Sequence, residues 1–120
     1  MWVFTSTGFV SAVRKTDSPD VYTVRSRDRK SLEPLAQMAK AAIALSPNGD
    51  YPYRVFVAPA VFTEWVCDQA GQIDYSNFKN QVSKSRGYEY AAALNDVWVA
   101  MLNTEDQSRI EMKEILGEMH

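Results

Sequence analysis

Hydrophobic and polar residues alternate with a period of two through most of the first half of the chain. This period predicts β-strands, because successive side chains of a strand point to opposite faces. We expect four strands, and the short connections between the first three predict that they form an antiparallel meander. The expected strands are Trp2–Thr5, Phe9–Lys15, Val21–Arg27 and Tyr53–Ala58.

A helical pattern separates the third strand from the fourth. Ser31 is a suitable N-cap, Pro34 falls within the first turn, and apolar residues recur on one side as far as Ile43. The segment Ser46–Asp50 is rich in turn-forming residues and ends the pattern. We therefore expect one helix over residues 31–45, after which the chain returns to the sheet.

The second half of the chain has the helical period of 3.6 residues throughout. A helix begins at Pro59, directly after the fourth strand, and two more helices follow it. Thr104, with Gln107 three residues later, forms a capping-box pattern that begins a last helix. The sequence predicts an α+β fold, a small antiparallel sheet packed against several helices, in a single domain over residues 1–120. Residues 104–120 form an amphipathic helix that can be an addition to this domain.

Two tryptophans of the helical half are expected in the hydrophobic core. Trp65 and Trp98 each belong to an apolar helical face, where tryptophan usually packs inward. The pattern therefore predicts that both are core residues and that neither is a binding anchor.

The arginines of the strands indicate which face of the sheet is buried. Burying a charged guanidinium without a partner is costly, so Tyr22, Val24 and the apolar residues that alternate with Arg54 are expected inside. The outer face is then expected to carry four residues that could bind a partner: Arg25, Arg27, Arg54 and Phe56.

Arginines interleaved with aromatic rings allow three interpretations. This combination stacks unpaired bases and neutralises phosphates, and it is equally the composition of a protein–protein contact. In the third interpretation, a later helix covers this face and the arginines pair with acidic residues from the second half. Lys79, at the end of the segment Asp74–Lys79, either extends a binding surface or is a solvent-facing residue of a helix.

Composition and charge exclude several classes of protein. The chain has 120 residues, one cysteine and a formal net charge of −2. A single cysteine forms no internal disulfide, and there is neither a signal sequence nor a long apolar run, so we expect a cytoplasmic protein without a membrane segment. The net charge argues against coating of nucleic acid by bulk electrostatics. The charge is uneven, since residues 1–58 hold 8 basic and 5 acidic residues and residues 59–120 hold 5 and 10.

No constellation of catalytic or metal-ligating residues is visible in the sequence. His120 is the single histidine and lies at the C-terminus, which argues against catalytic triads and histidine-rich zinc sites. Cys67 has no sequence context that indicates a reactive thiolate. No phosphate-binding or dinucleotide-binding glycine motif occurs. We therefore expect no catalytic residue, no metal, no cofactor and no enzymatic activity.

The last helix carries an apolar stripe at helical spacing. An amphipathic helix at a chain end buries its stripe against its own domain, a second copy or a foreign partner. Two methionines in the stripe suit an adaptable protein contact, although they also fill ordinary cores. The stripe consists of Met112, Ile115, Leu116 and Met119.

Several short segments form a combined pattern over residues 1–101. They are Met1-Trp-Val-Phe-Thr5, Gly8-Phe9-x-Ser11, Val24-Arg25-Ser-Arg27, Asp50-Tyr51-x-Tyr53-Arg54-x-Phe56-Val57, Asp74-Tyr75-x-Asn77-Phe78-Lys79, and then Tyr90, Leu94, Val97, Trp98 and Met101. In this pattern the chain resembles a family of short uncharacterised proteins found in bacteria, including actinobacteria, and in some of their phages. The resemblance implies no activity. A phage origin would favour a small accessory protein that acts on a host component.

The sequence therefore predicts a non-enzymatic protein-interaction module, which binds a cytoplasmic protein or a second copy of itself through the outer sheet face or the last helix. The alternative is a nucleic-acid-binding module that uses the arginines and Phe56 of the outer face.

Overall fold

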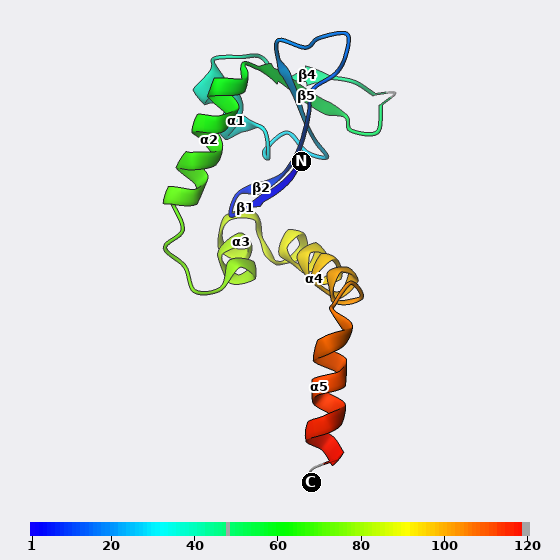
Figure 1. Ribbon diagram of the computed structural model, residues 1–120. Coiled ribbons are helices and arrows are strands. Elements are labelled where there is room, and N and C mark those ends of the chain that lie inside the picture. The colour runs from blue at the N-terminus through cyan, green and yellow to red at the C-terminus, as the bar shows by residue number, and fades with distance from the viewer. Residues whose placement is uncertain (48, 119–120) are drawn as a thin grey trace.

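The structure is a computed structural model that describes residues 1–47 and 49–118 and has an α+β fold (Figure 1). Within these residues, five antiparallel strands form one sheet in the order β1-β2-β3-β5-β4. The predicted fold class, the meander of the first three strands and the helical C-terminal half are confirmed. The strands are β1 (Trp2–Thr5), β2 (Gly8–Val13), β3 (Tyr22–Ser26), β4 (Ala44–Leu45) and β5 (Tyr53–Val57).

Five helices occur in the described part of the chain. The second helix begins at Pro59, as the sequence predicts, because proline has no N–H to leave unpaired in a first helical turn. The helices are α1 (Glu33–Ala39), α2 (Pro59–Gly71), α3 (Phe78–Arg86), α4 (Tyr88–Leu102) and α5 (Gln107–Glu118).

The helix predicted over residues 31–45 is wrong at both ends. It begins at Glu33 and ends at Ala39, and the chain then forms β4 at the edge of the sheet, next to β5. Lys40 adopts the left-handed conformation with φ 52°, and Ala41 N–H donates to the carbonyl of Ala36 over 3.0 Å. This is a Schellman termination, and it is hard to read from sequence because a lysine stands where glycine is usual.

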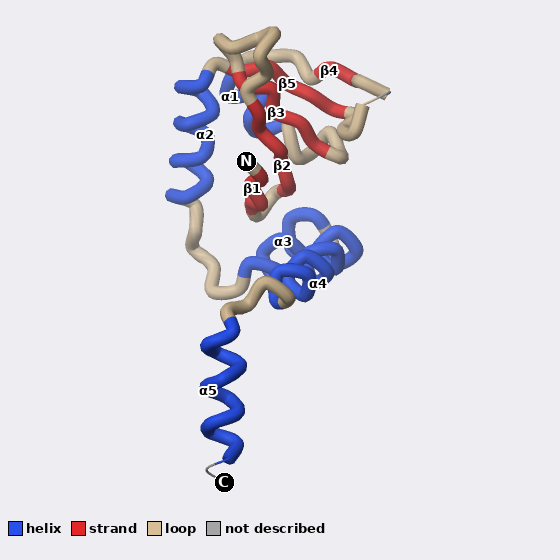
Figure 2. The backbone as a smooth tube through the Cα atoms, turned by 45° about the vertical axis from the view of Figure 1, so that its right-hand side comes forward, coloured by secondary structure: helices blue, strands red, loops and turns tan. Residues whose placement is uncertain are grey.

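The core lies between one face of the sheet and the helices α1 and α2, which Figure 2 shows on the same side of the sheet. Trp65 of α2 is 1% exposed, so its prediction as a core residue is confirmed. The largest apolar side chains contributed by the strands to this core are valines, as expected for half-buried strands. The buried cluster comprises Val10, Ala12, Val24, Leu32, Leu35, Ala36, Val55, Val57, Phe62 and Trp65.

The register of β3 against β5 confirms which residues share a face. Val24 lies opposite Val55 on the core side, and Arg25 lies opposite Arg54 on the other side. We call this other side the second face; the strand pairing places on it Trp2, Phe4, Phe9, Ser11, Thr23, Arg25, Arg54 and Phe56.

The helices α3 and α4 form an antiparallel pair that lies against the β1–β2 end of the second face, away from α1 and α2 (Figure 2). Of this pair, Val82 and Ala91 are buried, whereas the C-terminal half of α4 extends past the sheet. The prediction that Trp98 is a core residue is therefore wrong, since its side chain is 58% exposed. The apolar periodicity of α4 is real, but the fold provides no layer to cover this part of the helix.

Beyond α4, helix α5 points away from the rest of the molecule (Figure 1). It gives the molecule an elongated shape of 60 × 34 × 30 Å.

Candidate functional site

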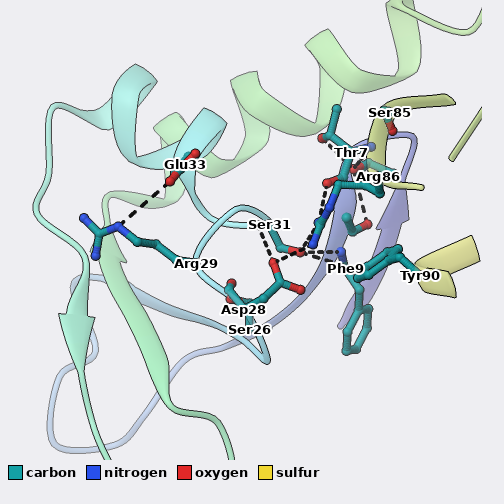
Figure 3. Close-up of polar contacts among 12 residues, drawn as sticks. Thr7, Phe9, Ser26, Asp28, Arg29, Ser31, Glu33, Ser85, Arg86 and Tyr90 are labelled. Atoms are coloured by element: carbon teal, nitrogen blue, oxygen red, sulfur yellow. Dashed lines mark hydrogen bonds and ion pairs between the residues drawn. The ribbon is translucent and has the colours of Figure 1, made fainter. Parts of the chain in front are cut away.

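Arg86, the last residue of α3, fixes the α3–α4 pair against the sheet (Figure 3). Its guanidinium donates to the carbonyl oxygen of Thr7 over 2.8 Å and forms an ion pair with Asp28 at 3.1 Å. The guanidinium carbon also lies 4.0 Å from the ring centroid of Tyr90 in α4. One side chain thus joins the β1–β2 turn, the loop after β3 and the first turn of α4.

Ser31 is the second part of this junction and is 3% exposed. Its hydroxyl oxygen accepts the N–H of Phe9 over 3.1 Å and the guanidinium of Arg86 over 3.2 Å. Its own N–H donates to the Asp28 carboxylate over 2.8 Å. The sequence analysis assigned Ser31 to a helix N-cap, but its hydroxyl joins the sheet to α3. Gly8 is required beside it, because a Cβ there would stand 2.2 Å from the Ser31 oxygen.

The junction leaves a hollow of about 410 Å³ between α4 and the aromatic end of the second face. Its floor is formed by rings from β1 and β2, and its opposite wall is formed by one side of α4. Apolar side chains line most of it, and Arg27 and Asp28 lie at one end. The lining residues are Trp2, Phe4, Phe9, Arg27, Asp28, Tyr51, Tyr90, Ala93, Leu94 and Val97.

A second hollow of about 410 Å³ continues the first towards the C-terminal half of α4. The two hollows share Phe4, Leu94 and Val97, so they adjoin at these residues. The second hollow ends between Lys79 of α3 and Trp98 of α4. We call the two hollows together the aromatic groove.

The floor of the aromatic groove is held in shape by contacts between its own rings. Phe4 stacks on Phe9 with centroids 4.5 Å apart, and Trp2 meets Phe9 edge to face at 5.7 Å. Stacked and edge-to-face pairs are favourable beyond their buried area, so this floor is preformed. Trp2 nevertheless stays 68% exposed, which leaves an apolar surface available to a partner.

A cation marks each end of the aromatic groove. Arg27 lies 4.4 Å over the Tyr51 ring at one end, and Lys79 lies 5.6 Å over the Trp98 ring at the other. Among the described residues, neither cation forms an ion pair with a carboxylate. The Arg86–Asp28 pair is internally neutral, so these two side chains give the groove a net positive charge.

The predicted binding residues do not form a single site. Arg25, Arg54 and Phe56 lie on the second face, and Phe56 is 50% exposed. Arg27 lies beyond the end of β3, and Lys79 lies on α3. Only Arg27 and Lys79 line the aromatic groove.

Tyr51 is a site residue that the sequence analysis missed. Its ring is 7% exposed and lies under two guanidinium groups, with Arg25 at 4.7 Å and Arg27 at 4.4 Å from its centroid. Arg25 also donates to the Ser11 hydroxyl over 2.9 Å. Ion pairing of Arg25 and Arg54 with acidic residues is not seen among the described residues. Tyr51 lies in a turn, where no periodicity signals its role.

The apolar stripe of α5 is not docked on its own domain. Met112, Ile115 and Leu116 are between 51% and 56% exposed. The fourth predicted member of the stripe, Met119, lies outside the described residues, as does His120.

Two further classes of site were searched for in the part of the chain that the structure describes. No group of three or more histidine, cysteine, aspartate or glutamate residues there is arranged to hold a metal ion. No helix there is long and apolar enough to cross a bilayer.

Comparison with known proteins found no match, since no protein-family model, no curated protein and no solved structure is significantly similar to this chain. The resemblance to short proteins of bacteria and their phages therefore stays a prediction, and function has to be argued from the aromatic groove and from α5.

Proposed function

We propose that this protein is a non-enzymatic interaction module that binds an amphipathic helix of a protein partner in the aromatic groove. The groove itself is the observation that supports this most, because two hollows of about 410 Å³ each adjoin at Phe4, one ring of the preformed aromatic floor. Contiguous exposed apolar surface is uncommon on a monomeric protein and usually marks a binding site.

The shape and charge of the groove favour a helix as the bound element. The groove runs beside α4 from Tyr90 to Trp98, which is the arrangement in which a helix lays its apolar face between existing elements. The cations Arg27 and Lys79 at its two ends favour a partner with carboxylates beside its apolar stripe.

The resemblance to short bacterial and phage proteins supports a finer version of this proposal. In that version the chain is an accessory protein, and its partner is a protein of the host cytoplasm.

A pull-down from bacterial lysate tests the proposal with a matched pair of variants. Ala93 lines the groove and Ala92 does not, while both are exposed on α4. We expect the parent protein and Ala92→Glu to capture the same partner with and without nuclease, and Ala93→Glu to lose it. Capture that disappears with nuclease, or that is the same for both variants, would reject the groove as the binding site.

Nucleic-acid binding remains the second candidate function, on one observation. Phe56 is half-exposed on the second face, which also carries Arg25 and Arg54, so a stacking ring lies on the same face as two cations. Arg25 and Arg54 are half-buried, and the guanidinium of Arg25 is bonded to Ser11 as well as stacked on Tyr51, which leaves these cations less available to a partner than the exposed Arg27 of the groove. For this reason we rank protein binding in the aromatic groove above nucleic-acid binding.

A further inference from the structure

Helix α5 is held away from its own domain by the segment that joins it to α4. Asn103, Thr104 and Glu105 each donate a backbone N–H to the carbonyl three residues earlier, over 3.0 to 3.2 Å. The Thr104 hydroxyl also donates to the carbonyl of Met101 over 2.7 Å. The chain therefore passes from α4 into α5 in a closely bonded run of turns without a reversal that would fold α5 back onto the groove.

The stripe of α5 has carboxylates along one edge. Met112, Ile115 and Leu116 share one side of the helix, because residues three and four apart are neighbours on a helix surface. At about 100° per residue, Glu111 and Glu114 both lie to the same side of this stripe, and both are exposed. The basic Arg109, on the other flank, forms an ion pair with Glu105.

The length, the apolar stripe and the acidic edge of α5 each match a property of the aromatic groove. The groove follows α4 from Tyr90 to Trp98, about 12 Å along the helix axis, and the stripe from Met112 to Leu116 needs about 6 Å. The groove offers an apolar floor with the cations Arg27 and Lys79, and α5 offers an apolar stripe with an acidic edge. The charge of the two halves of the sequence agrees with this pairing, since the first half, which contains Arg27, is net basic and the second half, which contains α5, is net acidic.

We infer that the occupant of the aromatic groove is α5 of a second copy of this chain. This inference rests on the proposed function and names its partner. Two copies that each donate α5 and each receive the other's α5 make the same contact twice, which closes a two-fold symmetric dimer. Each dimer contact then buries a helix stripe that is more than half exposed in the single chain.

Four full-length variants test the contact from both sides. On the groove side, Ala93→Glu introduces a negative charge that the dimer contact would bury against the acidic α5, and Ala92→Glu is its control. On the helix side, Leu116→Gln removes an apolar anchor, and Lys113→Gln outside the stripe is its control. By sedimentation velocity we expect the parent to be a dimer. We expect the dissociation constant of the dimer to be about tenfold higher or more for Ala93→Glu and Leu116→Gln, and to stay close to the parent value for the two controls. Unchanged circular dichroism would show that the variants remain folded.

A mixing experiment separates groove binding from pairing of two α5 helices. The Ala93→Glu chain keeps an intact α5, and the Leu116→Gln chain keeps an intact groove, so a mixture restores one of the two contacts. Cys67, the single cysteine of the sequence, is exposed on α2 and accepts a fluorescent label. We expect energy transfer between the labelled variants to show a heterodimer more stable than either homodimer.

Two results would overturn the inference. If Leu116→Gln abolishes the dimer while Ala93→Glu has no effect and mixing restores nothing, α5 pairs with α5 and the groove is not involved. A parent that is monomeric at high concentration also overturns it. In the latter case the proposed function still stands if Ala93→Glu, and not Ala92→Glu, loses a captured partner protein.

Discussion

Arg86 is the side chain on which the position of the helical half depends. Its side chain is 11% exposed, and it bonds Thr7, Ser31 and Asp28. Replacing it with alanine removes the ion-pair partner of the partly buried Asp28 and one donor each from the Thr7 carbonyl and the Ser31 hydroxyl, so we expect Arg86→Ala to lower the free energy of unfolding by about 2–3 kcal/mol in urea titrations. Arg29→Ala is the matched control, because its ion pair with Glu33 is exposed and contributes less than about 0.5 kcal/mol. Equal losses for the two variants would contradict this role of Arg86.

The two helical tryptophans are expected to differ sharply in their effect on stability. Trp65 is 1% exposed within the core, so Trp65→Ala is expected to cost about 3–5 kcal/mol. Trp98 is 58% exposed, so Trp98→Ala is expected to change the free energy of unfolding of the monomer by less than about 0.5 kcal/mol. Chemical denaturation of both variants measures this difference. A large loss for Trp98→Ala would mean that the C-terminal half of α4 is covered in solution.

Arg25 separates the structural and the nucleic-acid interpretations of the second face. Its stacking on the buried Tyr51 ring and its bond to Ser11 lead us to expect that Arg25→Ala lowers the free energy of unfolding by about 1 kcal/mol. Arg54→Ala is its partner variant on β5. Titration of the parent with single-stranded RNA and DNA at two salt concentrations is the second measurement. Binding that weakens steeply with salt, and is lost in both stable variants, would instead support the nucleic-acid candidate.

At the residue scale, alternation and charge predicted the sheet faces correctly. Val24 and Val55 are fully buried and Arg25 and Arg54 oppose each other on the second face, because the cost of burying a guanidinium decides between two otherwise similar faces. The role of Tyr51 was not predictable in this way. It depends on a contact between a turn and the end of a different strand, and single-residue patterns carry no such information.

At the element scale, the termination of α1 marks the limit of sequence reasoning. Three helices follow β5 before the last helix, as periodicity predicts, and α2 begins at Pro59 as its proline indicates. Helix α1 ends at Ala39 without such a signal, and apolar residues continue past Lys40. The following residues pair with β5, so sheet formation determines the boundary.

This termination gives a prediction for Lys40. A non-glycine residue in the left-handed region is strained by about 1 kcal/mol, and glycine removes the strain while adding some unfolded-state entropy. We expect Lys40→Gly to raise the free energy of unfolding by about 0.5–1 kcal/mol, measured by urea titration. Gln37→Gly within the same helix is the control, and is expected to lower it by about 1 kcal/mol. A loss of stability for Lys40→Gly would contradict the left-handed termination.

At the scale of the whole molecule, the division of the helices between the two sheet faces was not predictable from periodicity. An apolar stripe indicates that a helix is covered but not by what, and α4 carries one stripe that is only partly covered by the sheet. The placement of α3 and α4 on the second face depends on the junction of Arg86 with Asp28 and Ser31, and Arg86 lies far from both of them in the sequence. The aromatic groove follows from that placement.

Truncation after Asn103 tests how the whole molecule is assembled. The stripe of α5 is exposed and the core lies between the sheet, α1 and α2, so the truncated chain is expected to fold with a cooperative melting transition. If α5 fills the groove of a second copy, truncation converts a parent dimer into a monomer, and the melting temperature loses its dependence on protein concentration. Light scattering and melting curves at several concentrations measure both properties. Lost solubility or a collapsed transition would instead mean that α5 completes the core of its own domain, since a helix that only links two copies adds nothing to the fold of one.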